Sequence, residues 1–93
     1  MDKKQFEKEA KKSVDEVIAK IDKLEAKRDK AKEASKAEYD DKLNKLKARR
    51  DELQAKYEEL KHASNEKWED IKEAFSSAKE SFNEGFSKIS SLF

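Results

Sequence analysis

The residue types that carry out most enzyme chemistry are scarce in this chain. His62 is its one histidine and it has no cysteine, so a zinc site would need carboxylates alone or ligands from another chain. The lack of cysteine also excludes disulfides and thiolate catalysis. We therefore interpret His62 as a solvated residue near a turn, and we expect neither a metal site nor a cofactor.

Acidic residues are abundant, but their spacing does not favour acid–base catalysis. They occur as direct neighbours in the pairs Asp40-Asp41, Glu58-Glu59 and Glu69-Asp70. Neighbouring side chains on a helix point about 100° apart, so the two members of a pair do not converge on one substrate atom. We expect a non-enzymatic protein with no catalytic residue and no small-molecule substrate.

One short basic run, Lys47-Ala48-Arg49-Arg50, has the composition of a nucleic-acid contact. It is followed directly by Asp51-Glu52, and the chain as a whole has 23 Lys and Arg against 22 Asp and Glu, for a net charge of +1. A nearly neutral chain has no long-range field that would attract a polyanion. We interpret the run as a solvated helix face with Arg50 lying over an apolar seam, and we do not expect nucleic acid as a partner.

The strongest candidate for function is an aromatic face near the C-terminus. Residues 60–93 contain five of the eight aromatic residues. Within them Ile71, Phe82 and Phe93 are spaced by 11 residues, as are Phe75 and Phe86. Eleven residues make about three helical turns, so this spacing predicts a nearly straight stripe along a helix. The predicted interaction face consists of Trp68, Ile71, Phe75, Phe82, Phe86, Ile89 and Phe93.

Two uses of this face remain open at the level of sequence. It could pack in a core, against another helix or a second protomer. It could also enter loosely packed lipid by hydrophobic insertion, because the rest of this segment is rich in serine and nearly neutral. Gly85 costs a helix roughly 1 kcal/mol relative to alanine, so we expect this end to fray or to order on contact.

The composition predicts that long helices position these residues. Charged residues make up 48% of the chain and hydrophobic residues 34%, with one glycine and no proline. This favours an all-α coiled-coil protein in one domain over residues 1–93. Two heptad seams, whose registers differ by one residue, carry the apolar positions. The first seam contains Val14, Val17, Ile21 and Leu24, and the second contains Leu43, Leu46, Leu53, Tyr57 and Leu60.

The change of register falls within residues 33–38, and it has two interpretations. Ser35 and Glu38 have the spacing of a helix N-terminal capping box, which favours a turn near residue 35. The other residues there favour helix and include neither glycine nor asparagine, so we predict a continuous helix over 3–62, with a kink or turn at 34–38 as the alternative.

The next break is predicted near residue 64, where Ser64 and Asn65 are good N-cap residues. A second, amphipathic helix is predicted over 66–91. The expected fold is then an antiparallel hairpin of a long charged helix and this C-terminal helix. A three-helix bundle with breaks near 35 and 64 is the alternative.

Residues 53–78 resemble a family of small bacterial coiled-coil proteins, some of which are associated with stress responses. The resemblance lies in Glu58-Glu59-Leu60-Lys61, in Ala63-Ser64 and in Trp68-Glu69-Asp70-Ile71-Lys72. A second tryptophan of that family is replaced by phenylalanine here. The resemblance implies a helical, stress-related, non-enzymatic protein, and it offers no catalytic residue to transfer.

We therefore expect a structural or interaction protein that associates with itself or with a partner helix. The alternative is a reversible lipid-surface binder that makes peripheral membrane contact through the C-terminal 11-residue-repeat helix. No run approaches the about 18 apolar residues of a membrane span, and residues 1–12 lack the apolar segment of a secretory signal. A cytoplasmic location is the expectation.

Overall fold

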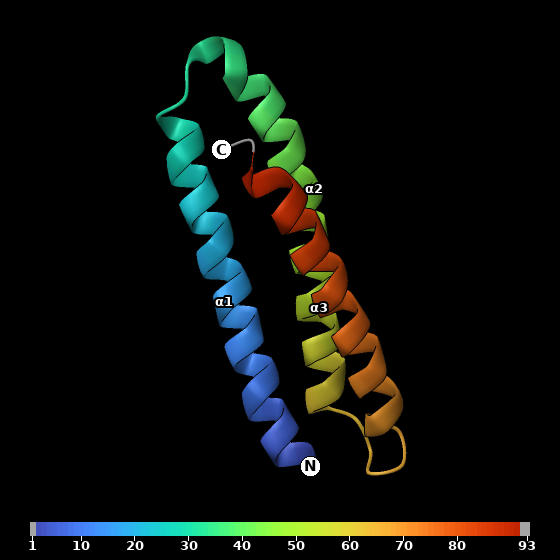
Figure 1. The fold of residues 1–93 in the computed structure, drawn as a ribbon. Helices are drawn as coiled ribbons and strands as arrows, with labels where there is room; N and C mark the ends of the chain where they lie inside the picture. Colours follow the sequence, from blue (N-terminus) through green and yellow to red (C-terminus); the bar gives the residue numbers. More distant parts are fainter. Residues whose placement is uncertain (1, 92–93) are drawn as a thin grey trace.

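The computed structural model describes residues 2–91, and within them the chain forms three α-helices and no β-strand (Figure 1). The helices are α1 (Lys3–Asp29), α2 (Glu33–Lys61) and α3 (Trp68–Ser90). Consecutive helices run in opposite directions, so α1 and α3 are parallel to each other. The bundle measures 51 × 18 × 16 Å. The prediction of an all-α chain is confirmed, and the three-helix alternative describes the arrangement.

The predicted continuous helix over residues 3–62 is wrong, because the chain turns at residues 30–32. The last turn of α1 tightens there, as the Lys30 and Ala31 N–H groups donate to carbonyls three residues earlier at 3.2 and 3.0 Å. Lys32 then has extended backbone, with φ −66° and ψ 146°. No residue of this turn has a positive φ, so the turn forms without glycine or asparagine. The absence of glycine and asparagine from residues 30–38 therefore does not indicate a continuous helix.

The start of α2 also differs from the predicted break at residues 34–38, because the predicted capping box lies inside the helix. The N-cap is Lys32, whose side chain makes no capping hydrogen bond. Glu33 places negative charge in the first turn, where it interacts favourably with the helix dipole. Its carboxylate also pairs with Lys36 at 2.9 Å. An ion pair within the first turn thus stands where a capping box was expected.

The chain turns again at residues 62–67, close to the break predicted near residue 64. The Ser64 carbonyl accepts hydrogen bonds from two N–H groups at the start of α3, both at 3.1 Å. Glu69 and Asp70 lie in the first turn of α3 and interact favourably with its dipole. The helix that follows is slightly shorter than the predicted helix over 66–91.

Each helix buries one side against the other two, and these sides form a single core. The two predicted heptad seams lie within it, and all of their residues are buried except Tyr57, which is half-buried at the edge. The buried apolar side chains are Phe6, Ala10, Val14, Val17, Ile21 and Leu24 from α1, Leu43, Leu46, Leu53 and Leu60 from α2, and Phe75, Ala78, Phe82 and Ile89 from α3.

Helix α3 packs with heptad spacing, so the predicted 11-residue stripe does not describe its buried side. The buried positions are Phe75, Ala78, Phe82, Gly85 and Ile89, which follow each other in steps of three and four. This alternation keeps one side of a helix toward its neighbours in a left-handed bundle, and it matches the seams of α1 and α2. The other residues of the stripe within the described range lie at the edge of the core.

Candidate functional site

Half of the described residues of the predicted interaction face lie inside the bundle. Phe75 and Phe82 are 2% and 0% exposed, and Ile89 is also buried. The half-buried members pack against the core from its edge and keep part of their surface in solvent; they are Trp68, Ile71 and Phe86. Phe93 lies outside the described residues. Two of the four aromatic residues of α3 are therefore core, and the two half-buried ones, Trp68 and Phe86, offer a surface.

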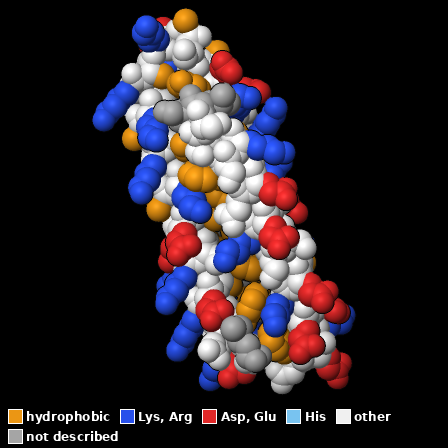
Figure 2. All heavy atoms as spheres, in the orientation of Figure 1, with side chains coloured by type: hydrophobic (Ala, Val, Ile, Leu, Met, Phe, Trp, Pro, Cys, Tyr) orange, Lys and Arg blue, Asp and Glu red, His pale blue; other side chains and the backbone are white. Residues whose placement is uncertain are grey.

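These half-buried aromatic residues lie where α1 and α3 meet. The two helices contact each other much less than each contacts α2. The Phe6 ring of α1 lies 6.4 Å from the Trp68 ring and 5.9 Å from the Phe75 ring, measured between centroids. Farther along α3, the Phe82 and Phe86 rings stack with centroids 6.2 Å apart. Figure 2 shows hydrophobic side chains in a row along the middle of this side of the molecule.

Two lysines lie over the rings on this side. Lys20 Nζ is 5.1 Å from the centroid of Phe86, and Lys72 Nζ is 5.6 Å from those of both Phe6 and Trp68. Each contact is a cation–π interaction worth about 0.5–1 kcal/mol at an exposed site. We call the surface formed by these residues the α1–α3 face; it consists of Phe6, Lys20, Trp68, Lys72 and Phe86. Sequence reasoning missed its lysines, although Lys20 follows Phe6 by two heptads and so lies on the same side of α1.

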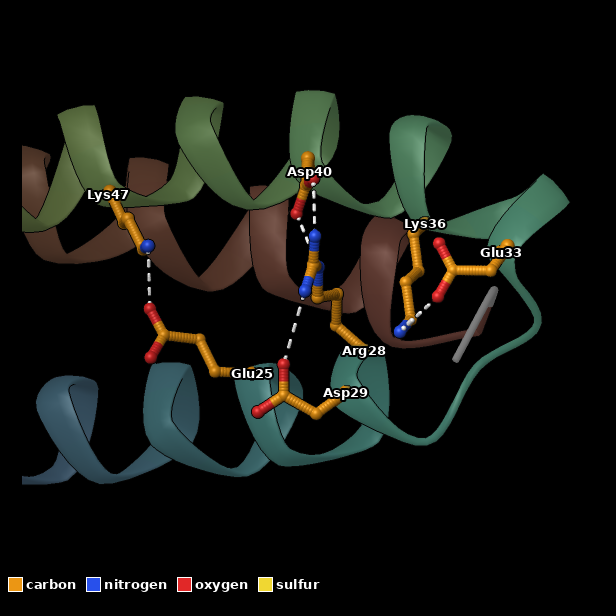
Figure 3. Close-up of polar contacts among 7 residues, drawn as sticks. All are labelled: Glu25, Arg28, Asp29, Glu33, Lys36, Asp40 and Lys47. Atoms are coloured by element: carbon orange, nitrogen blue, oxygen red, sulfur yellow. Dashed lines mark hydrogen bonds and ion pairs between the residues drawn. The ribbon is translucent and has the colours of Figure 1, made fainter.

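Ion pairs connect α1 to α2 near the first turn (Figure 3). Arg28 donates from Nε to Asp40 Oδ1 at 2.6 Å and from Nη2 to Asp40 Oδ2 at 2.8 Å, a two-pronged contact. Nearby, Lys47 Nζ lies 2.6 Å from Glu25 Oε1. The hydrogen bonds from Arg28 lower the pKa of Asp40, and the same contact raises the pKa of Arg28. Asp40 thus has a structural partner.

The basic run has a different role from the solvated face that we predicted. Lys47 reaches α1 through Glu25, and Arg49 Nη1 donates to the Ser81 carbonyl of α3. Arg50, which was expected to lie over the seam, pairs with the adjacent Asp51 at 3.0 Å. Two of the three cations therefore tie α2 to its neighbours. Their heptad positions place them beside the seam, but nothing in the sequence specifies these partners.

The remaining predicted site residues lie on the surface. His62 caps the end of α2 and is exposed. Other carboxylates of the adjacent pairs form short-range ion pairs within α2, of which Asp41 with Lys45 at 3.6 Å is one example. Among residues 2–91 no three histidine, aspartate or glutamate side chains gather as a metal site would require. None of the helices in that range has the length and apolar character needed to cross a membrane.

No protein-family model, curated protein or solved structure matches this chain. The resemblance to small bacterial coiled-coil proteins therefore rests on the quoted residues alone. The function has to be inferred from surfaces of the bundle, and the α1–α3 face is the one that contains the half-buried aromatic side chains of α3, Trp68 and Phe86.

Proposed function

We propose that this chain is a non-enzymatic structural or interaction protein that associates with a second copy of itself through the α1–α3 face. The observation that carries the proposal is the partial exposure of Trp68 and Phe86 at the least packed of the three helix contacts. The proposal includes a cytoplasmic location and the stress association that the resemblance implies. The proposal includes no nucleic-acid partner and no small-molecule substrate.

The chemistry of the α1–α3 face fits a helical partner. Lys20 and Lys72 cover the rings only with flexible side chains, which can move aside when another apolar surface approaches. Burying the remaining aromatic area then contributes about 25 cal/mol per Å². Two helices that lie side by side with a shallow apolar row between them can accept a further helix, as neighbouring helices do in a four-helix arrangement.

Sedimentation velocity across the micromolar range tests the self-association. We expect the parent protein to sediment as a dimer and Phe86→Ser to sediment as a monomer with unchanged helix content. Tyr57→Ser is the matched control, because Tyr57 is another half-buried aromatic residue at the edge of the core but belongs to α2. A parent protein that stays monomeric at every concentration would contradict the proposal.

The second candidate function is reversible binding to a lipid surface, and the character of α3 favours it. α3 is the most amphipathic of the three helices, and its serines Ser76, Ser77 and Ser87 are exposed. Since Phe75 and Phe82 are buried, α3 would have to leave the bundle to insert them. Binding should shift the emission of Trp68 to shorter wavelength and make the protein float with vesicles of unsaturated neutral lipid. If neither occurs, the lipid function is excluded.

The stress association has a separate test. Deleting the gene is expected to lower survival after heat or osmotic shock and to leave unstressed growth unchanged. Equal survival of the deletion strain and its parent would remove this part of the proposal without affecting the self-association.

A further inference from the structure

A shallow basic groove lies on a different side of the bundle, between α2 and the last turns of α3. Its volume is about 190 Å³. The rim is formed by the cations Lys42, Lys45, Arg49 and Lys88, and the floor by Leu46, Gly85 and Ile89. No carboxylate is among its described lining residues. In a chain with a net charge of +1, this is a local concentration of positive charge above an apolar floor.

The floor exists because α3 has no side chain at Gly85. A Cβ atom there would lie 2.9 Å from Arg49 Nη1 and 3.2 Å from Leu46 Cδ2. Arg49 uses this space to donate to the Ser81 carbonyl, which holds its guanidinium at the inner edge of the groove. Leu46 is 0% exposed and lies beneath the groove, so Ile89, at 9% exposed, is the apolar side chain of the floor that solvent reaches.

The lysines of the rim are weakly engaged within the chain. Lys45 pairs with Asp41 at 3.6 Å, and both side chains are about 70% exposed, so the pair is worth roughly 0–1 kcal/mol. Lys42 and Lys88 form no ion pair with another described residue. Two or three ammonium groups are therefore available to an external anion at this site.

We propose that this groove binds the carboxylate end of a single-chain fatty acid. The carboxylate lies between Lys42 and Lys88, and the first methylenes lie against Ile89 and the aliphatic stems of the rim lysines. An inorganic anion would gain nothing from the apolar floor, and each buried methylene contributes about 0.8 kcal/mol. The groove is smaller than the about 300 Å³ of a typical small-molecule pocket, which suits the head and first carbons of one chain.

Titration of the isotope-labelled full chain with sodium octanoate, followed by amide NMR, tests the proposal. We expect saturable shifts confined to residues 42–49 and 81–90. Acetate has the same headgroup without the chain, and octanol has the chain without the charge, so both should bind at least several-fold more weakly. The groove is separate from the α1–α3 face, so the result does not depend on whether the protein dimerises.

A pair of charge variants identifies the headgroup contact. Replacing two rim cations, Lys42→Glu with Lys88→Glu, should raise the octanoate Kd about tenfold, which corresponds to about 1.4 kcal/mol. Lys12→Glu with Lys23→Glu makes the same change in net charge on exposed positions of α1 and should leave the Kd unchanged. Circular dichroism is used to check that both variants fold.

Four results would overturn the assignment. Shifts spread over all three helices without saturation would mean nonspecific adsorption. Equal weakening by the control pair would mean a response to net charge alone. Acetate binding as tightly as octanoate would mean a simple anion site, and octanol binding as tightly would mean that the rim cations take no part.

Discussion

Gly85 and Arg49 act as one unit at the contact between α2 and α3. The missing side chain of Gly85 gives room to the Arg49 guanidinium, which bonds to the backbone of α3. From the sequence alone, the only expected effect of Gly85 is to destabilise the helix. Its use depends on a neighbour 36 positions away in the chain, which no local pattern encodes.

We predict that Gly85→Ala lowers stability, although alanine favours helix by about 1 kcal/mol. The new Cβ displaces the Arg49 guanidinium, and a hydrogen bond from a charged group is worth about 1.5–3 kcal/mol. In the background of Arg49→Met, the same substitution should become stabilising, because no guanidinium is displaced and Leu46 Cδ2, at 3.2 Å, has to move only slightly. Urea unfolding of the four proteins measures this cycle. The same sign in both backgrounds would show that Arg49 does not mediate the effect.

The contact between Arg28 and Asp40 predicts a dependence of stability on acid. The pKa of Asp40 is lowered in the folded state by its hydrogen bonds from Arg28. Its contribution is therefore present above the unfolded pKa of about 3.9, and it is lost as the pH falls through the lowered folded value. Asp40→Asn should be less stable than the parent at neutral pH, and the two should converge under strongly acidic conditions.

Thermal unfolding at a series of pH values measures this convergence. Glu33 contributes in the same direction, since its pKa is lowered by the hydrogen bond from Lys36. Asp15→Asn, at an exposed position in the middle of α1, serves as the control and should follow the parent curve. If the difference in stability between Asp40→Asn and the parent is the same at all pH values, the titration of Asp40 does not contribute to stability.

The helices themselves are the part of the fold that sequence predicts best. The heptad seams predict most of the buried residues of α1 and α2, because the apolar side of a helix is the side that packs in the core. The turn at residues 30–32 escapes prediction because its backbone angles suit almost any residue. The sequence does not single out the buried positions within the predicted face of α3, because Phe75, Phe82 and Ile89 fit a heptad while other pairs fit an 11-residue spacing. Packing against α1 and α2 decides between them.

The first turn can be tested with proline. Glu33 is the first residue of α2, and Lys32 before it is extended, which is the backbone that proline requires of its predecessor. Glu33→Pro should therefore change the free energy of unfolding by less than about 1 kcal/mol. Ala37→Pro, within α2, should cost about 3 kcal/mol or more. Equal, large losses in both variants by urea unfolding would favour a continuous helix through the turn.

The whole molecule is built mainly from contacts between helices that follow each other in the chain. The α1–α2 and α2–α3 contacts are far more extensive than the α1–α3 contact. Proteins dominated by such local contacts fold in microseconds to milliseconds. We predict folding in that range by temperature-jump fluorescence of Trp68, which lies near Phe6 of α1 and so reports the closing of the bundle. Folding over seconds would indicate a slow step that this topology does not contain.

The odd number of helices among residues 2–91 has a mechanical consequence. α1 starts at one end of the 51 Å bundle, and the last turn of α3 points toward the other end. A pull between these points would act along the long axis and slide the helices past one another. The core side chains and the Arg28, Lys47 and Arg49 bridges would then share the load, whereas a two-helix hairpin would peel open one turn at a time. The bundle should therefore resist extension along its long axis until several contacts between helices break together.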